Sequence, residues 1–391
     1  MKNLDSEKSK KLDLFIKQNW AMKSIVEMAD EMGVADSTII RHAKKMRLPK
    51  KSVMLEPPKD AKSLREMKAK KDKTTEGKRQ MDSLLKENEK LTHLLNIKED
   101  LTPHRIVKIE PHKGSGDRQA TAFVLASDWH LEQRVDSNKM IYNNEYTLEI
   151  AEKRAKQFFQ ATLTMLKEAE QNVKIDNLVL WLGGDFITGN IHTENLKICQ
   201  LGPAQAICFA RDLLISGIEF LLKETKVKIT IPYNHGNHAR ITDKVWKSTE
   251  EDNSLEYILY DAIAYHFKGN KRIEMVAPKG SVSMVEVYGL KICFVHGHHG
   301  FRYLDGVGGL YIPARKYVMR KFKNLNPYLI VMGHHHQYLQ DTYFICNGSM
   351  IGYDQYADSC GFPYDIPKQT FFLIEEKRKC RTITRPILFD D

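Results

Sequence analysis

The chain has 391 residues, 42% of them hydrophobic, and its 60 Lys and Arg exceed its 50 Asp and Glu to give a net charge of +10. At about 150 residues per domain, this length predicts two or three domains and a large core. No apolar run reaches the roughly 18 residues of a membrane-spanning helix, so we expect a soluble protein without a membrane partner.

The cysteines and the N-terminal residues indicate the cellular compartment. The six cysteines are scattered and form no CxxC pair, which favours reduced thiols over a disulfide framework. The opening MKNLDSEKSKKLDLF is basic but lacks the apolar segment and cleavage site of a secretory signal. We therefore expect a cytoplasmic protein.

The positive charge is concentrated in the first quarter of the chain. Residues 1–100 contain 24 Lys and Arg against 17 Asp and Glu, so +7 of the net charge lies there. A basic appendage on a nearly balanced body favours a polyanionic partner, most simply nucleic acid, although solvated surface lysines explain the charge equally well.

The first predicted elements are helices between residues 12 and 48. The stretch SIVEMADEMGVADSTIIRHAKKMRL has Ala29 four residues before Gly33, and Gly33 suits a tight turn. Ile39 and Ile40 follow at spacings that pack a second helix on the first. This pattern predicts a helix-turn-helix.

The second of these helices is the expected DNA-binding element. Asp36 or Ser37 is predicted to cap it. Residue types that reach phosphates and base edges lie on or near its exposed face, namely Ser37, Thr38, Arg41, His42 and Lys45. The segment resembles helix-turn-helix domains of bacterial and phage regulators and recombinases; the alternative is a three-helix module that binds protein or acts as a spacer.

A second helical pattern follows Pro49 and the Pro57-Pro58 break. Its apolar positions alternate three- and four-residue steps around one polar Asn, at Met81, Leu84, Asn88, Leu91 and Leu95. Two heptads of this kind indicate either a short coiled coil that forms a homodimer through residues 81–98 or a helix that packs on the C-terminal domain of its own chain.

From Thr121 onward, strand-like and helical segments alternate. The apolar runs are TAFVLAS, NLVLWLGG, VKITIPYN, KICFVHG and PYLIVMGHH, and helices are predicted from Asn144 to Lys167 and from Pro203 to Leu222. This alternation predicts a layered α/β fold whose strands are covered on both faces.

Each of these five runs ends in residue types that can serve as metal ligands. In chain order the endings are Asp128-Trp129-His130, Gly184-Asp185, Gly236-Asn237-His238, His296-Gly297-His298 and Gly333-His334-His335-His336. Nine of the fifteen histidines lie in or beside these segments. Because α/β folds place ligands at the carboxyl ends of strands, five such endings in sequence predict one site.

Over residues 120–380 these motifs resemble the calcineurin-like metallophosphoesterase superfamily, whose signature is DxH, GD, GNH, H and GHxH in that order. The resemblance implies a four-layer α-β-β-α sandwich, here preceded by the small all-α helix-turn-helix domain and a helical linker. It also implies two metal sites that share Asp185. One would be formed by Asp128, His130, Asp185 and His336, and the other by Asp185, Asn237, His296 and His334.

The mixture of imidazole, carboxylate and amide ligands suits two borderline divalent ions, with Mn²⁺ expected first and Fe²⁺ or Zn²⁺ as alternatives. Two such ions about 3.5 to 4 Å apart can clamp the attacking and leaving oxygens of an in-line displacement at phosphorus. A hydroxide would then attack the phosphorus without a covalent enzyme intermediate.

Two further residues are expected to be catalytic. The resemblance places His238 over the phosphate, where it would stabilise the pentacovalent state or protonate the leaving oxygen. An acidic residue often follows this histidine, but here Ala239 and Arg240 follow, which leaves the proton donor open. Arg240 either binds a phosphate oxygen or is a surface residue. Pocket-lining or supporting roles are expected for His192, His235, His298, His299 and His335.

The surroundings of the centre must select the substrate, because the superfamily includes protein phosphatases, small-molecule phosphodiesterases and nucleases. A helix-turn-helix domain (1–50) and a basic helical linker (51–118) before the catalytic domain (119–391) favour a DNA nuclease. The stretches GGDFITGNIHTE and GNHARITDK resemble phage and prophage DNA repair exonucleases, which implies a bacterial or phage-infected host cell. The alternatives are a phosphatase with an N-terminal assembly element and a non-catalytic DNA-binding protein.

Overall fold

The computed structural model describes residues 2–20, 23–48, 106–111, 118–193, 195–299 and 309–389. The chain divides into two compact units, Met1–Pro103 and His104–Asp391, which are described separately. The predicted seam at 81–98 lies outside the described residues, so the dimer stays a prediction, as do the bounds of the three predicted domains. None of the described helices is both long and apolar enough to cross a membrane.

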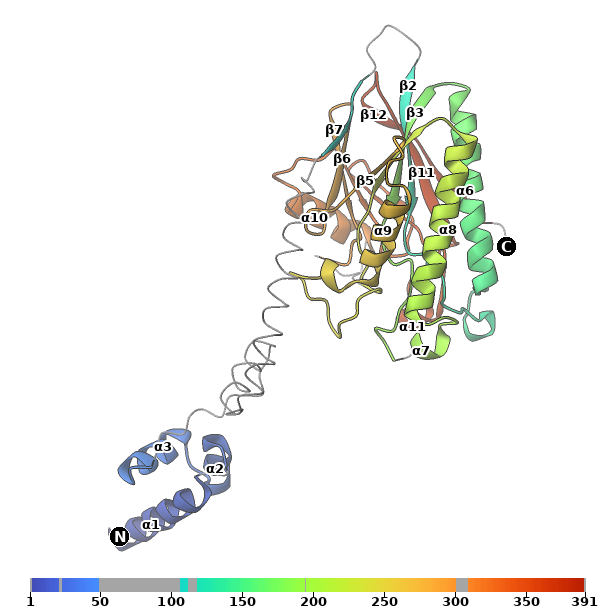
Figure 1. Ribbon diagram of the computed structural model, residues 1–391. Coiled ribbons are helices and arrows are strands. Elements are labelled where there is room, and N and C mark those ends of the chain that lie inside the picture. The colour runs from blue at the N-terminus through green and yellow to red at the C-terminus, as the bar shows by residue number, and fades with distance from the viewer. Residues whose placement is uncertain are drawn as a thin grey trace, which may run out of the picture. The chain divides into compact units, whose positions relative to one another are not determined.

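The N-terminal unit contains three described helices, α1 (Lys2–Asn19), α2 (Ile25–Met32) and α3 (Asp36–Lys45) (Figure 1). Ser24 and Glu27 form a capping box at the start of α2, and Gly33 ends that helix with a left-handed φ of 61°. A small apolar cluster joins the helices through Leu12, Ile16, Met28, Ala29, Ile39 and Ala43.

Two expectations for α3 were wrong. Neither Asp36 nor Ser37 caps the helix, because Ala35 is the cap residue with extended backbone and Asp36 is already the first helical residue. Its carboxylate therefore lies in the first turn, where a negative charge favours the helix dipole. Ile39 is fully buried but Ile40 is 50% exposed, since consecutive residues of a helix point about 100° apart.

The C-terminal unit contains two six-stranded sheets. The first has the order β1-β6-β7-β8-β10-β9, and the second has the order β12-β11-β2-β3-β4-β5. The strands of the first are β1 (Val107–Ile109), β6 (Ser283–Val287), β7 (Leu290–Val295), β8 (Leu329–Met332), β9 (Leu339–Gln340) and β10 (Phe344–Cys346). Those of the second are β2 (Gln119–Ala126), β3 (Lys174–Leu182), β4 (Lys228–Pro232), β5 (Ile273–Val276), β11 (Lys368–Glu375) and β12 (Cys380–Leu388).

Helices pack on the outer face of each sheet, and Figure 1 shows α6, α8 and α9 along the second one. The described helices are α6 (Leu148–Glu170), α7 (Asn195–Ile198), α8 (Pro203–Glu224), α9 (Leu255–His266), α10 (Tyr311–Lys321) and α11 (Gln355–Cys360), with 3₁₀ turns η1 (Ser137–Lys139) and η2 (Glu251–Asn253). The α/β prediction is confirmed.

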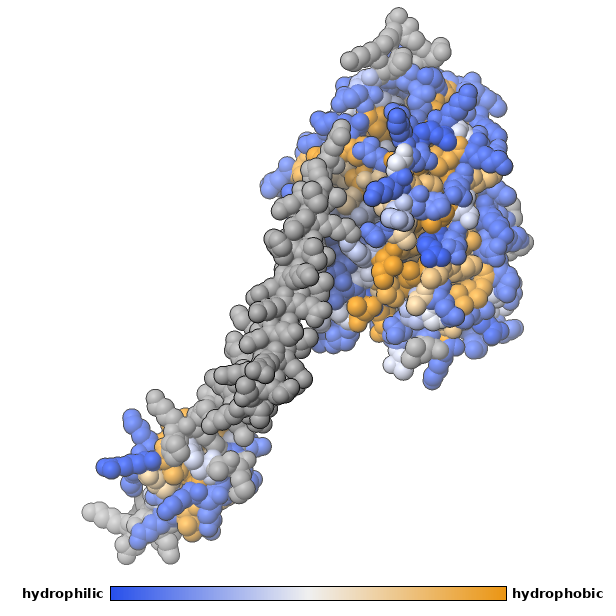
Figure 2. All heavy atoms as spheres, in the orientation of Figure 1, coloured by the Kyte–Doolittle hydropathy of each residue, from blue (hydrophilic) through white to orange (hydrophobic). Residues whose placement is uncertain are grey.

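Three apolar clusters separate these layers. Phe158 of α6 and Leu214 of α8 pack on β2 to β4, Tyr317 of α10 packs on β7 and β8, and Phe123 and Phe294 meet between the two sheets. Hydrophilic residues cover most of the face in Figure 2, with hydrophobic areas over the helical side of this unit. The second sheet thus lies between helices and the other sheet, which explains why its inner strands β2 and β11 are almost entirely buried.

Candidate metal centre

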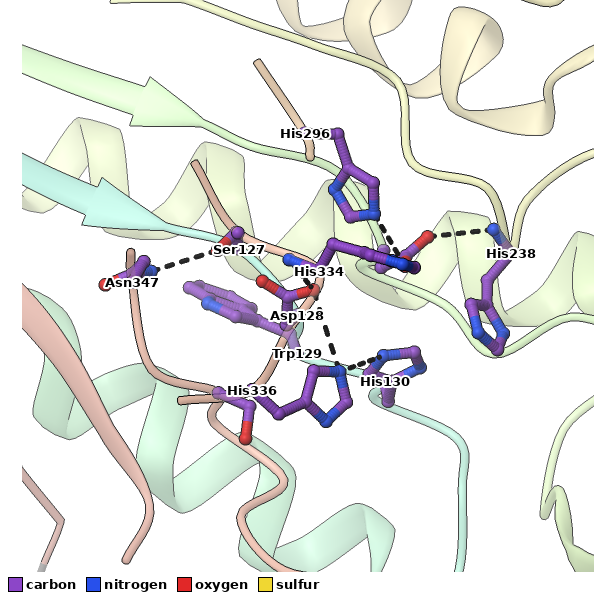
Figure 3. A network of polar contacts seen from close by, with 12 residues as sticks. Ser127, Asp128, Trp129, His130, His238, His296, His334, His336 and Asn347 are labelled. Carbon is purple, nitrogen blue, oxygen red and sulfur yellow. Dashed lines mark hydrogen bonds and ion pairs between the residues drawn. The ribbon is translucent and has the colours of Figure 1, made fainter. Parts of the chain in front are cut away.

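All five predicted ligand segments meet in one place, although they come from two sheets. The segments after β2, β3 and β4 leave three neighbouring parallel strands of the second sheet, and those after β7 and β8 leave two neighbouring parallel strands of the first. Figure 3 shows Asp128, His130, His296, His334 and His336 facing one another. The carboxyl ends of both sheets therefore build the centre together.

The backbone at these ligands is unusual. Nine described residues other than glycine have positive φ, and five of them are predicted ligands, namely Asp128 (57°), His130 (47°), Asp185 (53°), His334 (68°) and His336 (53°). Each such residue costs on the order of 1 kcal/mol or more, so the surrounding structure must hold it in place. Backbone strain is thus concentrated at the candidate site.

Glycines allow the segments to approach closely. A Cβ atom on Gly236 would lie 2.0 Å from Oδ1 of Asp185, and one on Gly333 would lie 2.5 Å from Oδ2 of Asp128. Gly184 has a φ of 86°, and a Cβ there would meet the nitrogen of Gly236 at 2.3 Å. Only glycine leaves room for the two carboxylates at these positions.

A first group of ligand atoms lies between Asp128, His130 and His336, all within 4.8 Å of one another. The Nε2 atoms of His130 and His336 are 3.1 Å apart, and Nε2 of His336 is 3.6 Å from Oδ1 of Asp128. Oδ2 of Asp128 is buried without a hydrogen-bond partner. A buried carboxylate oxygen beside two facing imidazole nitrogens fits a cation.

A second group adjoins the first at Asp185. Oδ2 of Asp185 lies 2.9 Å from Nε2 of His296, which is also 3.2 Å from Oδ1 of Asn237. Ligand atoms of Asp185, His296 and His334 lie within 4.8 Å of one another, and those of Asp185 and His130 do so as well. Asp185 therefore lies between the two groups, as a shared ligand must.

Asp185 and His296 shift each other's pKa values. Burial raises the pKa of Asp185, but His296 and His238 outweigh it and hold that pKa well below its usual range. Burial lowers the pKa of His296, whereas the Asp185 and Asp128 carboxylates raise it to about 10. A proton on His296 thus occupies a position that a divalent cation can take instead.

Two buried glutamates that the sequence did not single out hold the ligand loops together. Glu132 accepts hydrogen bonds from the N–H groups of Thr188 and Gly189, and Glu256 accepts from those of Phe186 and Gly236. Burial raises their pKa values to about 7 and about 8 respectively. Glu132 is only two residues after His130, but no sequence signal points to Glu256.

His238 lies beside the centre, with its ring 4.8 Å from that of His130. Its N–H donates to Oδ1 of Asp185 at 2.8 Å, and its Nδ1 lies 3.0 Å from the carbonyl oxygen of Thr188. The carbonyl of Thr188 therefore orients the His238 ring, since no carboxylate follows His238 in the sequence to do so. Burial lowers the pKa of His238.

Arg240 is half-buried, and its Nη1 donates to the carbonyl of Asn237 at 2.7 Å. This bond holds the Asn237 loop, and a phosphate contact by Arg240 stays a prediction. The ring of His335 lies 5.0 Å from that of His334, His235 is buried against Tyr260, and His192 is exposed.

The residues predicted to bind DNA lie on α3. Ser37, Arg41 and Lys45 are exposed, and Thr38 is half-buried. Nδ1 of His42 lies 2.6 Å from Oδ1 of Asp13 in α1, so His42 has a partner within its own unit. Their contact with DNA stays a prediction.

Comparison with protein-family models gives no match, and comparison with curated proteins gives none either. Solved structures do match at low identity. Vacuolar Protein Sorting 29 from Cryptosporidium parvum is 12% identical over 70% of this chain and 100% of its own, with a TM-score of 0.29. The calcineurin-like phosphoesterase YfkN from Bacillus subtilis is 11% identical over 69% and 90%, with a TM-score of 0.29. A phosphoesterase-like protein from Streptococcus pneumoniae is 12% identical over 67% and 84%, with a TM-score of 0.25.

Proposed function

We propose that this chain is a two-metal-dependent phosphodiesterase of the calcineurin-like metallophosphoesterase type that cleaves DNA. The observation that carries the proposal is the meeting of two ligand groups at the shared Asp185 carboxylate. The arrangement of two sheets between helices agrees with the four-layer sandwich that the motifs imply.

The donor set fits borderline divalent cations because it combines four imidazoles with two carboxylates and one amide oxygen. Asp128, His130, Asp185 and His336 would hold one cation, and Asp185, Asn237, His296 and His334 would hold the other. Such a pair would supply charge stabilisation for the phosphoryl oxygens and would lower the pKa of a bound water.

His238 would assist the departure of the leaving group. Its bond to the Thr188 carbonyl fixes a proton on Nδ1 and leaves Nε2 as the exchanging nitrogen. Burial favours the neutral ring in the free chain, whereas the negative charge of a bound phosphodiester favours the charged ring. The charged His238 would then give its Nε2 proton to the leaving oxygen as the phosphorus–oxygen bond breaks.

Two features support nucleic acid as the substrate. The exposed Arg41 and Lys45 on α3 are suited to phosphates. A trio of aromatic rings, Tyr142, Tyr353 and Tyr364, has centroid distances of 4.6 to 5.6 Å. Tyr142 is 45% and Tyr364 40% exposed, so bases could stack there.

This trio lies near the centre along the chain. Tyr353 follows three residues after Met350, whose N–H donates to the carbonyl of Asp128 at 3.1 Å. A short stretch of chain therefore joins Tyr353 to the loop of Asp128.

The test is a cleavage assay on single-stranded, double-stranded and branched DNA, RNA, a generic phosphodiester and a phosphopeptide, with Mn²⁺ and with chelator. We expect DNA cleavage that requires Mn²⁺ and stops with chelator. A pure preparation that hydrolyses only phosphopeptides or phosphomonoesters would show a phosphatase instead.

A further inference from the structure

A third group of metal-binding side chains lies beside the centre but belongs to neither of its two ligand groups. Glu250 has one carboxylate oxygen 2.6 Å from Nε2 of His298 and the other 2.5 Å from Nε2 of His299. The two imidazole rings are 3.8 Å apart. Ligand atoms of these three residues lie within 4.8 Å of one another.

Two loops of the centre bring these residues together from distant parts of the sequence. His298 and His299 follow His296 after Gly297, which has a φ of 118°, a backbone conformation that favours glycine. Glu250 precedes η2 in a segment whose ends meet at a backbone bridge between Arg240 and Ser254. The group therefore forms only when the Asn237 and His296 loops have both taken their places.

The surroundings of the group resemble an open metal site more than a surface ion pair. The side chains of His298 and Glu250 are only 8% and 12% exposed, whereas His299 is 24% exposed and keeps one side accessible. Nδ1 of His298 is buried without a hydrogen-bond partner. Two imidazoles and one carboxylate, with a fourth position left to water or ligand, form a common zinc site.

We propose that Glu250, His298 and His299 form a third divalent-cation site, suited to Zn²⁺. The His298 ring lies 5.3 Å from that of His296 and 6.0 Å from that of His334, so the third cation would adjoin the proposed pair. The third site would bind the same kind of cation as the two proposed metal sites, but none of its three residues is a ligand of those sites.

The first experiment counts metal ions in the full chain. Protein stripped with chelator is reloaded with Zn²⁺, dialysed and analysed for zinc per chain. We expect about three ions in the unaltered chain and about two in Glu250→Gln, which keeps the shape of the side chain but weakens its binding. Glu219→Gln is the matched control, because Glu219 pairs with His266 at 2.8 Å on the surface and should not change the count.

A second variant covers the case in which Glu250→Gln fails to fold. His299→Asn removes the most exposed ligand of the three and should also lower the zinc count by about one. Circular dichroism of each variant shows whether it is folded, and zinc anomalous scattering from crystals locates the ions directly.

The outcomes separate this inference from the proposed function. Two ions per chain together with Mn²⁺-dependent cleavage would overturn the third site and leave the pair standing. An unchanged count in both folded variants would overturn it as well. In Asp185→Asn, which weakens the shared ligand of the pair, retention of one zinc that disappears on adding Glu250→Gln would support the third site independently of activity.

Discussion

The metal centre and the three-helix unit place their candidate functional residues in opposite settings. In the centre these residues are mostly buried, and five of them have left-handed backbone that glycines and buried glutamates hold in place. In the three-helix unit Arg41 and Lys45 are exposed on α3, and the unit is held by a small apolar cluster beneath them. Substitutions should thus separate stability from function easily in the unit and only with difficulty in the centre.

The largest effect is expected at Asp185, the shared ligand. Asp185→Asn keeps the size of the side chain but removes the charge that both proposed cations use. Loss of several kcal/mol of charge stabilisation predicts a fall in kcat/KM for DNA of about a thousandfold. Asp176→Asn on β3, the strand that precedes Asp185, is the control, because that carboxylate is 50% exposed and pairs with Lys174. Activity within about tenfold of the unaltered chain in Asp185→Asn would rule out its bridging role.

His238 should give the second largest effect and should leave the metals bound. His238→Gln removes the proton donor but no metal ligand, so kcat should fall by about a hundredfold while the metal content stays constant. His266→Gln, which alters a surface histidine, should change neither quantity. If His238→Gln loses metal in parallel with activity, His238 acts as a ligand and not as the proton donor.

The sequence predicted the positions of the five candidate ligand segments because each follows a strongly apolar strand, and all five predicted strands are present. That these residues bind metals stays a prediction. The sequence could not show that β7 and β8 belong to a different sheet from β2, β3 and β4. All five strands are buried on both faces at their carboxyl ends, so their apolar runs look alike whichever sheet they join.

Features that depend on distant contacts were not predictable. The helix expected from Asn144 begins at Leu148, because the amide of Asn144 instead donates to the carbonyls of Ile351 and Tyr353. Glu256 supports the Asp185 loop from 71 positions further along the chain, and no local pattern marks it. The left-handed backbone of the ligands likewise follows from tertiary contacts, since nothing in their residue types requires it.

In the three-helix unit, two neighbouring isoleucines allow a buried position to be compared with an exposed one. Ile39→Ala removes a fully buried side chain and should destabilise the unit by roughly 2 to 5 kcal/mol. Ile40→Ala changes a side chain that is 50% exposed and should stay within about 0.5 kcal/mol. Urea unfolding followed by circular dichroism measures both.

If the unit recruits DNA, Ile39→Ala should also weaken DNA binding while hydrolysis of a small diester stays unchanged. DNA affinity that is equal in both isoleucine variants and in the unaltered chain would contradict a DNA-binding role for the unit. Loss of small-diester hydrolysis in Ile39→Ala would mean that the metal centre depends on the folding of the three-helix unit.

The smallest effect is expected at the ion pair of Arg118 and Glu375, which belongs neither to the metal centre nor to the three-helix unit. Nε and Nη2 of Arg118 each lie 3.0 Å from one oxygen of Glu375, and this hydrogen-bonded pairing lowers the pKa of Glu375 below its ordinary value. A carboxyl whose pKa is lower in the folded state adds stability above its unfolded-state pKa and loses it as the pH falls through the folded value.

Arg118→Gln should therefore lower the urea midpoint slightly at neutral pH, and the difference from the unaltered chain should disappear in acid once Glu375 is protonated. Arg378→Gln should have a weaker effect, because Nη1 of Arg378 lies 3.5 Å from Glu375. Urea unfolding of the three proteins at neutral and acidic pH measures these differences. A midpoint difference for Arg118→Gln that persists unchanged in acid would mean that the arginine stabilises this sheet edge by packing, because no charged partner would remain for it there.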